Sequence, residues 1–301
     1  MLRGAVGLAD KLGISKLVVG MTIVAFGTSA PEFLVSLNAA LSGASALAIG
    51  NLVGSNISNI LLVTGVAALL MPIIVEKESF KRDGWILLVG TGLFLLLAFK
   101  SEISFFSGLV LLLYFFCFLI YSYIREKRFS NDFNKVCEQD VGFVSRSMFA
   151  LLIYLTLGIA GLVFGARILV EGGVGLARLF HVSETVIGLT VMALGTSLPE
   201  LAATVVAAIR KQSDMALGNI VGSNIFNIVG IVGVISIITP LDIPSRVLNI
   251  DGWVMLGATL LLMPYIIGRW TRLSRFEAFL FLLAYLIYIF SVTHGADTLI
   301  P

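Results

Sequence analysis

The sequence GTSAPE, Gly27 to Glu32, interrupts a long apolar stretch with a carboxylate, two hydroxyls and a helix-breaking proline. The sequence GTSLPE, Gly195 to Glu200, interrupts a second apolar stretch in the same way, 168 residues later. Adding 168 to each position from 1 to 72 aligns two segments without a gap, and 31 of these 72 positions are identical. The chain therefore contains two copies of one unit, and this repeat is the starting point for predicting the fold.

The composition is that of an integral membrane protein. Hydrophobic residues make up 58% of the 301 residues and charged residues 13%, and the mean hydropathy is +1.03. A soluble domain carries about 25% charged residues. The apolar blocks are long enough to cross a bilayer core of about 30 Å, which takes about 20 helical residues. We therefore expect these blocks to lie in a lipid bilayer. We expect no nucleic acid as a partner, because the basic residues lie at the ends of the blocks.

Nine apolar blocks are predicted to be membrane-spanning helices, at 16–41, 47–71, 84–99, 103–124, 148–179, 185–209, 215–238, 252–268 and 275–292. Residues 1–12 align only with the end of the block at 148–179. Either the chain lacks most of a first helix or the sequence begins late, and we favour the late start, because half a helix would leave a gap beside its neighbours. The prediction is an all-α polytopic membrane protein with an N-terminal half at 1–124, a linker at 125–147 and a C-terminal half at 148–301.

The number of helices per copy predicts how the two halves are oriented. With five helices in each complete copy, the second copy enters the membrane in the opposite direction to the first. Such inverted-topology repeats are common in secondary transporters. With the linker in the cytoplasm, 16 of the 20 Lys and Arg residues lie on the cytoplasmic side, in accord with the positive-inside rule. This topology places the C-terminus outside, and the compact form favours the plasma (inner) membrane.

The first repeated motif gathers polar groups on one face of a helix. Pro31 has no N–H for the carbonyl of Gly27, and Pro199 has the same effect on Gly195. Freed carbonyls within a bilayer are tolerated only where they face protein, water or an ion. The following residues share the face in the first copy: Ala25, Thr28, Ser29 and Glu32.

The second repeated motif reads GNLVGSNISNI from Gly50 and GNIVGSNIFNI from Gly218. Its polar residues are spaced by four and so share one helix face in each copy. In the first copy they are Asn51, Ser55 and Asn59, and in the second copy Asn219, Ser223 and Asn227. Their glycines also form GxxxG patterns, which are typical of close helix packing. Packing alone leaves the asparagines unexplained.

A pseudo-twofold axis between the copies would bring Glu32 and Glu200 together at the middle of the membrane. A charge at the centre of a membrane helix costs about 2.5–3.5 kcal/mol on insertion scales, so such residues usually mark an ion or substrate path. The surrounding donors are oxygens, which suit hard cations such as Ca²⁺ better than zinc or copper. Two negative charges match one Ca²⁺ or at least two Na⁺, and a site that holds either in turn can exchange them.

GTSxPE paired with GNxxGSNxxN, once in each half, resembles the alpha-repeats of the cation/calcium antiporter superfamily, which includes the sodium/calcium exchangers. The resemblance implies ten helices in two inverted halves, with the first and sixth helices sliding across a compact core. It implies cation ligands at Ala25 (carbonyl), Thr28, Ser29, Glu32, Ser55 and Asn59, and at Ala193 (carbonyl), Thr196, Ser197, Glu200, Ser223 and Asn227. Some potassium-using relatives carry Asp at the position of Asn227, so Asn argues against potassium coupling.

Other functions account less well for these residues. An intramembrane hydrolase using Ser29 or Ser197 would need a nearby His or Lys to activate the serine, and the sequence places none there. A channel would need a continuous pore with weak binding sites. Two buried carboxylates instead form a strong binding site, which suits exchange better. We therefore expect an antiporter, not an enzyme, that exchanges Ca²⁺ for Na⁺ by alternating access. Proton-coupled calcium antiport stays open, because a glutamate pair can carry protons. We expect no cofactor and no obligate protein partner.

Overall fold

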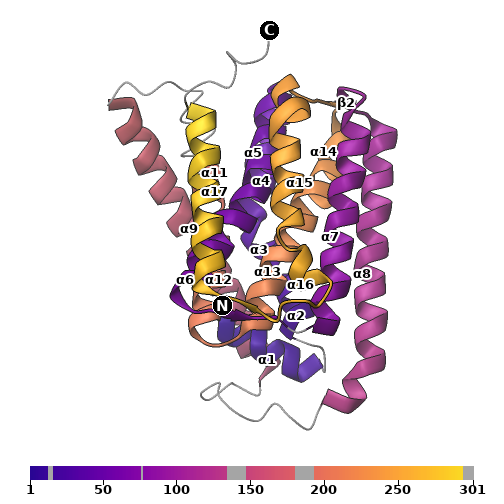
Figure 1. Ribbon diagram of the computed structural model, residues 1–301, viewed down its shortest axis with the longest axis vertical. Helices are drawn as coiled ribbons and strands as arrows, with labels where there is room; N and C mark the ends of the chain where they lie inside the picture. Colours follow the sequence, from indigo (N-terminus) through magenta and orange to yellow (C-terminus); the bar gives the residue numbers. More distant parts are fainter. Residues whose placement is uncertain (13–15, 76, 134–146, 180–192, 294–301) are drawn as a thin grey trace.

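The computed structural model describes residues 1–12, 16–75, 77–133, 147–179 and 193–293. These residues form a bundle in which most helices run along one common direction (Figure 1). Within them, six helices are long and apolar enough to cross a membrane, and seven if one bent pair is counted as a single span. The prediction of a polytopic helical protein is confirmed.

The first half contains the shorter helix α1 (Leu2–Leu12) and four further helical stretches. The first of these stretches is broken into several pieces. The label η denotes a π-helical segment. The bounds are α2 (Lys16–Val19), η1 (Gly20–Val24), α3 (Ala25–Thr28) and α4 (Ala30–Leu41); α5 (Ser45–Ser58), η2 (Asn59–Val63) and α6 (Thr64–Leu70); α7 (Lys77–Ala98); and α8 (Phe105–Phe133).

The second half repeats this order with one long helix in front. Its bounds are α9 (Met148–Leu179); α11 (Ala193–Thr196) and α12 (Leu198–Ile209); α13 (Ser213–Ile225), η4 (Phe226–Ile231) and α14 (Val232–Ile238); η5 (Val247–Asp251), α15 (Gly252–Leu260) and α16 (Met263–Ile266); and α17 (Arg275–Thr293). The start of the block predicted at 185–209, His181, His294 and most of the linker lie outside the described residues. The block predicted to begin at residue 84 begins earlier, at Lys77, so that its basic residues form the first turns of α7.

The two halves are inverted. Figure 1 shows α5 and α6 running from the upper end of the bundle to the lower end, while their repeat mates α13 and α14 run from the lower end to the upper. Two short antiparallel strand pairs join the halves, a local departure from the all-α prediction. β1 (Ile73–Ile74) pairs with β4 (Arg272–Leu273), and β2 (Glu102–Ile103) pairs with β3 (Leu241–Asp242).

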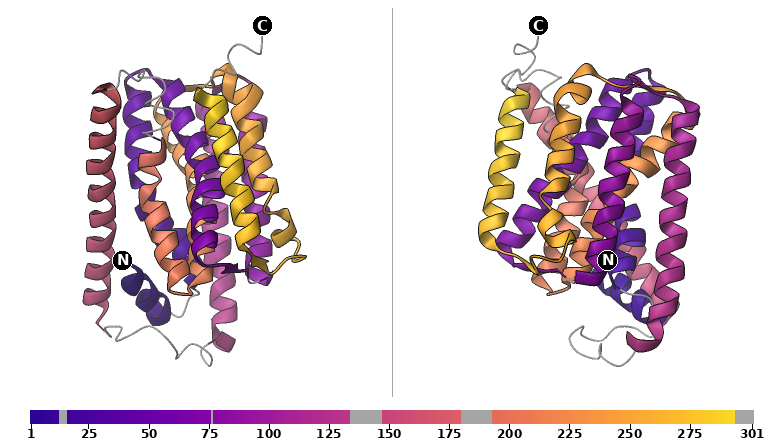
Figure 2. Two further views of the ribbon diagram at one scale, coloured as in Figure 1. Left: turned by 60° about the vertical axis from the view of Figure 1, so that its left-hand side comes forward. Right: turned by 45° about the vertical axis from the view of Figure 1, so that its right-hand side comes forward.

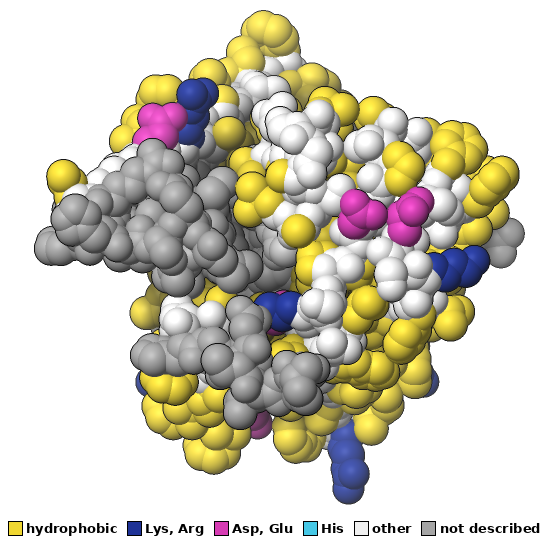
Figure 3. All heavy atoms as spheres, turned by 90° about the horizontal axis from the view of Figure 1, so that it is seen from above, with side chains coloured by type: hydrophobic (Ala, Val, Ile, Leu, Met, Phe, Trp, Pro, Cys, Tyr) yellow, Lys and Arg dark blue, Asp and Glu magenta, His cyan; other side chains and the backbone are white. Residues whose placement is uncertain are grey.

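The most buried helices are the ones that carry the second repeated motif. The spans Ser45–Leu70 and Ser213–Ile238 are 78% and 83% buried within the protein, whereas Met148–Gly165 is 11% buried and Arg275–Thr293 is 22% buried. The exposed side chains of the outer helices are large and apolar, among them Phe106, Leu113 and Phe276. Viewed from the upper end, hydrophobic side chains gather around much of the margin of the bundle (Figure 3). The outer helices therefore face lipid, and the central pair forms the core.

Glycines allow the helices at two junctions to come very close. A Cβ added to Gly222 on α13 would lie 2.3 Å from the main-chain oxygen of Met21 on η1. A Cβ added to Gly4 on α1 would lie 2.7 Å from the main-chain oxygen of Leu151 on α9. Small residues permit this kind of backbone approach in membrane helices. The broken helix of the first motif is therefore packed directly against the second half.

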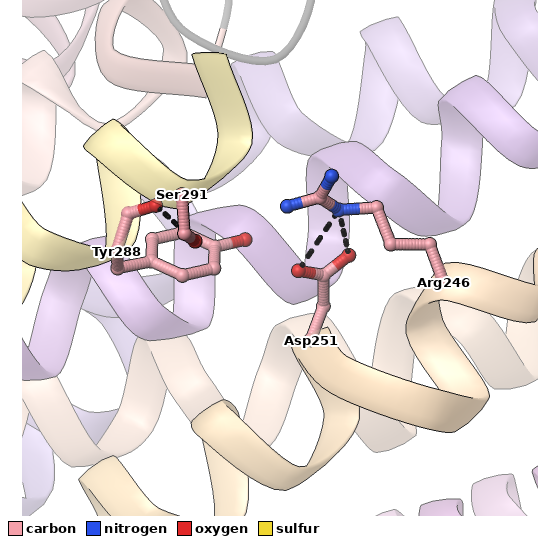
Figure 4. A network of polar contacts seen from close by, with 4 residues as sticks. All are labelled: Arg246, Asp251, Tyr288 and Ser291. Carbon is pink, nitrogen blue, oxygen red and sulfur yellow. Dashed lines mark hydrogen bonds and ion pairs between the residues drawn. The ribbon is translucent and has the colours of Figure 1, made fainter. Parts of the chain in front are cut away.

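The repeat extends beyond residue 72, because Asp83-Gly84-Trp85 aligns with Asp251-Gly252-Trp253 at the same offset of 168. Both aspartates are buried, and each pairs with an arginine. Arg246 contacts Asp251 at 3.2 Å, and the hydroxyl end of Tyr288 on α17 points toward the same carboxylate (Figure 4). Asp83 pairs with its neighbour Arg82. The arginines do not align with each other, so only the carboxylates belong to the repeat.

Candidate cation-binding site

Both copies of the first motif break their helix at a serine. Ser29 has φ −83° and ψ 9°, and Ser197 has φ −83° and ψ 2°, between helical segments on either side. The segments Gly20–Thr28 and Ala30–Leu41 are bent by 52° relative to each other. The predicted proline distortion is therefore a complete break, and Pro31 lies in the first turn of a new helix. A proline is tolerated there because N–H groups in a first turn have no partner within the helix.

The break places each glutamate in the first turn of a helix, Glu32 in α4 and Glu200 in α12. The N-terminus of a helix carries partial positive charge, which favours a carboxylate at this position. Both side chains are almost fully buried, with 0% and 1% of their surface exposed. They lie near enough for their charges to interact. Both carboxylates are therefore inside the protein, and the cation site that the repeat predicts at them stays a prediction.

Each glutamate accepts a hydrogen bond from the serine of the opposite half. Ser29 Oγ donates to Glu200 Oε1 at 2.7 Å, and Ser197 Oγ donates to Glu32 Oε1 at 3.3 Å. Both serines are buried. The two bonds are related by the offset of 168, so the site follows the pseudo-twofold symmetry of the repeat. Neither half contains a complete site by itself.

The threonines of the motif occupy equivalent places beside the carboxylates. Thr28 Oγ1 lies 3.2 Å from the carbonyl oxygen of Ala25, and the same carbonyl accepts the main-chain N–H of Ser29 at 2.9 Å. Thr196 Oγ1 lies 3.5 Å from Ser55 Oγ on α5. The Ala25 carbonyl thus accepts bonds within its own turn. Ala193 begins α11, but its side chain lies outside the described part of the structure.

The second motif places its last asparagine where the helix widens. Asn59 begins η2, and Asn227 is the second residue of η4. In each case the carbonyl oxygen accepts an N–H from five residues ahead, from Thr64 and from Val232. π-Helical turns of this kind frequently occur at functional sites. The helical periodicity of the sequence contained no signal for these turns.

Several buried polar atoms of the predicted ligands have no hydrogen-bond partner among the described residues. They are Oε2 of Glu32, Oε2 of Glu200, and both amide side-chain atoms of Asn59 and of Asn227. Ser223, the repeat mate of Ser55, is also completely buried. Most buried polar groups in proteins are hydrogen-bonded, and an exception requires an explanation such as an ion. Oxygens that are buried and unpartnered in this way are suitable ligands for a cation.

The structure adds two residues that the predicted ligand set does not contain. Thr28 Oγ1 donates to Asn219 Oδ1 at 3.2 Å, and Thr196 Oγ1 donates to Asn51 Oδ1 at 3.3 Å. Both asparagines are buried. Their spacing of four from Ser55 and Ser223 was visible in the sequence, but their partners were not. They contact ligands of the opposite half, which sequence periodicity cannot show.

Comparison with known proteins agrees with the repeat and with the fold. The family model described as sodium/calcium exchanger protein matches residues 1–124 and 150–293. The sodium/calcium exchanger MaX1 of Methanosarcina acetivorans is 37% identical over 332 aligned positions, covering 97% of this chain and 93% of that protein. The inner membrane protein YrbG of Escherichia coli is 36% identical over 255 positions, covering 83% of this chain and 78% of that protein.

Solved structures of the sodium-calcium exchanger NCX_Mj have the same fold. The structure obtained after soaking with 2.5 mM Na⁺ and 0.1 mM Ca²⁺ superimposes with a TM-score of 0.81 at 32% identity, covering 96% of this chain and 91% of that one. The structure soaked with 10 mM Na⁺ and 10 mM Sr²⁺ gives the same TM-score. With the doubled motif, the inverted halves and these similarities combined, the chain belongs to the sodium/calcium exchanger family.

Proposed function

We propose that this protein exchanges Ca²⁺ for Na⁺ across the membrane, by alternating access to a site built on Glu32 and Glu200. The observation that carries the proposal is a pair of buried carboxylates, each of which has one oxygen without a partner. Among the described residues, neither carboxylate forms an ion pair with Lys, Arg or His. Burying an unpaired ionised carboxylate is very unfavourable. A bound cation supplies the missing charge.

The donor set supports Ca²⁺ and Na⁺ as the transported ions. Ca²⁺ takes six to eight oxygen ligands from carboxylates, amides, main-chain carbonyls and water. Carboxylates, hydroxyls and amide oxygens of these kinds surround the centre of this site. One Ca²⁺ or two Na⁺ balances the two carboxylates, but both loads together would leave uncompensated positive charge in a medium of low dielectric constant. The two ions therefore compete, and competition couples their transport.

The loose packing of α9 supports alternating access. This helix stands at the edge of the bundle with α1 beside it (Figure 2), and 11% of its window Met148–Gly165 is buried. A cavity of about 1130 Å³ is lined by residues of α9, η1, α3, α8 and η4, among them Phe26, Ile159 and Phe226. A helix with few buried contacts can slide at little free-energy cost. Sliding of α9 past the broken helix would expose the site first to one side of the membrane and then to the other.

The distribution of basic residues supports an orientation in the membrane. The lower end of the bundle in Figure 1 carries Lys81, Arg82, Arg210, Lys211, Arg269, Arg272 and Arg275, whereas Lys100 and Arg246 lie at the upper end. Basic residues are enriched on the cytoplasmic side. We therefore place the lower end and the linker at 125–147 in the cytoplasm, the C-terminus outside, and the protein in the plasma membrane.

The test uses purified protein in sealed vesicles loaded with labelled calcium, with sodium and pH gradients imposed separately. Calcium efflux should require external sodium and should be small when no counter-ion is present. If more than two Na⁺ move per Ca²⁺, efflux should also change with an imposed voltage, at about 2.3 kcal/mol per charge per 100 mV.

The proton-coupled alternative gives the opposite pattern in the same vesicles. Efflux that ignores sodium but follows an imposed pH gradient would establish proton coupling and would overturn sodium coupling. Vesicles that contain the Glu32→Gln variant serve as the control for leakage, because their calcium should stay trapped under either gradient.

A further inference from the structure

We infer that Asn51 and Asn219 are positioning residues that orient the hydroxyls of Thr196 and Thr28 for cation binding, each acting across the interface between the halves. The inference rests on the proposed function, because it takes the two threonines as cation ligands. It adds two residues outside the predicted ligand set and assigns each a partner. Asn219 acts on the threonine of the first half, and Asn51 acts on the threonine of the second.

The contacts of Asn219 hold its amide in one orientation. Its Nδ2 donates to Thr204 Oγ1 at 2.9 Å and lies 3.4 Å from the main-chain oxygen of Glu200. With both contacts on the nitrogen side, Oδ1 points in the other direction, where it accepts from Thr28 Oγ1 at 3.2 Å. Asn219 and Thr204 are 1% and 0% exposed, so water is not available to take over either bond.

Asn51 makes two equivalent side-chain contacts in the other half. Its Nδ2 donates to Ser36 Oγ at 3.0 Å, and its Oδ1 accepts from Thr196 Oγ1 at 3.3 Å. Ser36 is the repeat mate of Thr204, and its hydroxyl in turn lies 3.4 Å from the main-chain oxygen of Ala48. The two copies thus place a hydroxyl, an amide and a threonine in the same order, so the arrangement follows the pseudo-twofold symmetry of the repeat.

The chemistry of a hydroxyl explains what this arrangement does. A threonine hydroxyl has one hydrogen to donate and two lone pairs that can accept. A cation is bound by the lone pairs, so the hydrogen has to point elsewhere. When the amide oxygen takes the hydrogen, both lone pairs are left for the cation. Thr28 has a second acceptor at the same 3.2 Å, the Ala25 carbonyl, and a cation bound to that carbonyl would leave Asn219 Oδ1 as the acceptor for the hydrogen. Holding donors in advance in the geometry that the ion requires avoids reorganisation on binding.

The test measures calcium binding to the full-length protein in detergent by calorimetry, so that its result does not depend on how transport is coupled. Asn219→Ala and Asn51→Ala should each weaken calcium affinity by about two- to tenfold, the range expected for one hydrogen bond. Double-mutant cycles then identify the partner. Asn219→Ala should have little further effect after Thr28→Val, but its full effect after Thr196→Val. Asn51→Ala should show the reverse pattern.

The reciprocal pattern separates positioning from general damage to the fold. Equal coupling of each asparagine to both threonines, or unchanged affinity in both alanine variants, would overturn the inference. If an alanine variant fails to fold, Thr204→Val and Ser36→Ala test the same proposal, because they release the amide without removing it. Thr204→Val should weaken binding and lose its effect after Thr28→Val. An independent effect would count against the inference.

A further control distinguishes this inference from the proposed function. Calcium binding that persists in Glu32→Gln and Glu200→Gln would show that the ligand site is elsewhere. Loss of binding in those variants, together with no effect of the asparagine variants, would contradict the positioning role alone.

Discussion

Among the described residues, four acidic side chains are buried, and they fall into two classes. Asp83 and Asp251 each pair with an arginine, so their charge is compensated within the protein. Glu32 and Glu200 accept hydrogen bonds from serines, which are neutral. The desolvation of a charge is offset in proteins by an ion pair or by a bound metal. Of these four, only the glutamates therefore lack a compensating charge from another side chain, although all four carboxylates are repeated at the offset of 168.

At the level of single residues, we predict that Glu32→Gln and Glu200→Gln each abolish calcium transport while the protein stays folded. Glutamine keeps the shape of the side chain but removes one charge, so a dehydrated divalent cation is left undercompensated. Calcium at about 100 times its dissociation constant should stabilise the unmodified protein by about 2.7 kcal/mol, and either variant should lose most of this gain. Thermal unfolding with calcium and with a chelator measures the gain, and vesicle uptake measures transport.

A control for the charge argument is Ser107→Ala, which changes a buried hydroxyl at the upper end of α8. It should leave transport and calcium stabilisation near those of the unmodified protein. Near-normal uptake by either glutamine variant would remove Glu32 and Glu200 from the site.

The helices of the site are irregular where the ligands lie. The first motif breaks its helix at Ser29 and at Ser197, and the second motif widens its helix at η2 and η4. Irregular backbone at membrane depth is tolerated where it is buried in protein or lines a polar cavity. The π turns are buried, because they lie in the spans Ser45–Leu70 and Ser213–Ile238, which form the core. The outer helices therefore protect these turns from lipid.

The close packing of these elements predicts a strong effect of Gly222→Ala. A Cβ at this position would meet the main-chain oxygen of Met21 at 2.3 Å, and the backbone cannot move aside as a flexible side chain could. Overpacking of this kind costs about 1–3 kcal/mol. The thermal unfolding midpoint should fall by several degrees, and calcium binding should weaken as η1 is displaced.

The matched control is Gly92→Ala on α7, where an added Cβ meets no atom within 4 Å. Alanine is the better helix former, so the unfolding midpoint should stay the same or rise. Equal effects of the two substitutions would show that contact between η1 and α13 is not what requires the glycine.

The whole molecule is one structure made from two inverted copies, and the copies depend on each other. The hydrogen bonds from Ser29 to Glu200 and from Ser197 to Glu32 each connect one half with the other. Two strand pairs at opposite ends also join the halves. A pseudo-symmetric transporter of this kind can present equivalent faces of one site to the two sides of the membrane.

For the topology of the whole molecule, we predict that Ser42→Cys and Arg210→Cys are labelled from opposite sides of the membrane. The two residues are repeat mates, at the ends of α4 and α12, and both side chains are exposed. The measurement adds a membrane-impermeant thiol reagent to intact cells or to inverted vesicles. Cys117 and Cys137 are first replaced by serine, and that background should stay unlabelled. Labelling of both positions from one side would refute the inverted topology.

The sequence by itself determined the class of protein, the repeat and the position of most spans. These properties depend on local hydrophobicity and on identity at a fixed offset, and both can be read along the chain. The repeat also predicted that Glu32 and Glu200 would lie in one site, and the structure shows each of them bonded to the serine of the opposite half. The twelve predicted ligands and the orientation in the membrane stay predictions, and transport and labelling experiments would test them.

Only the tertiary structure decided which atoms pair. The bond from Ser29 to Glu200 joins residues 171 positions apart, and the bond from Thr28 to Asn219 joins residues 191 positions apart. Such distances depend on how two halves pack to within a fraction of an ångström, because a hydrogen bond weakens steeply outside its narrow geometry. The complete break at Ser29 and the π turns at Asn59 and Asn227 were likewise visible only in the structure. The arginine partners of Asp83 and Asp251 lie one and five residues away in sequence, and the structure decided which of the nearby side chains pair.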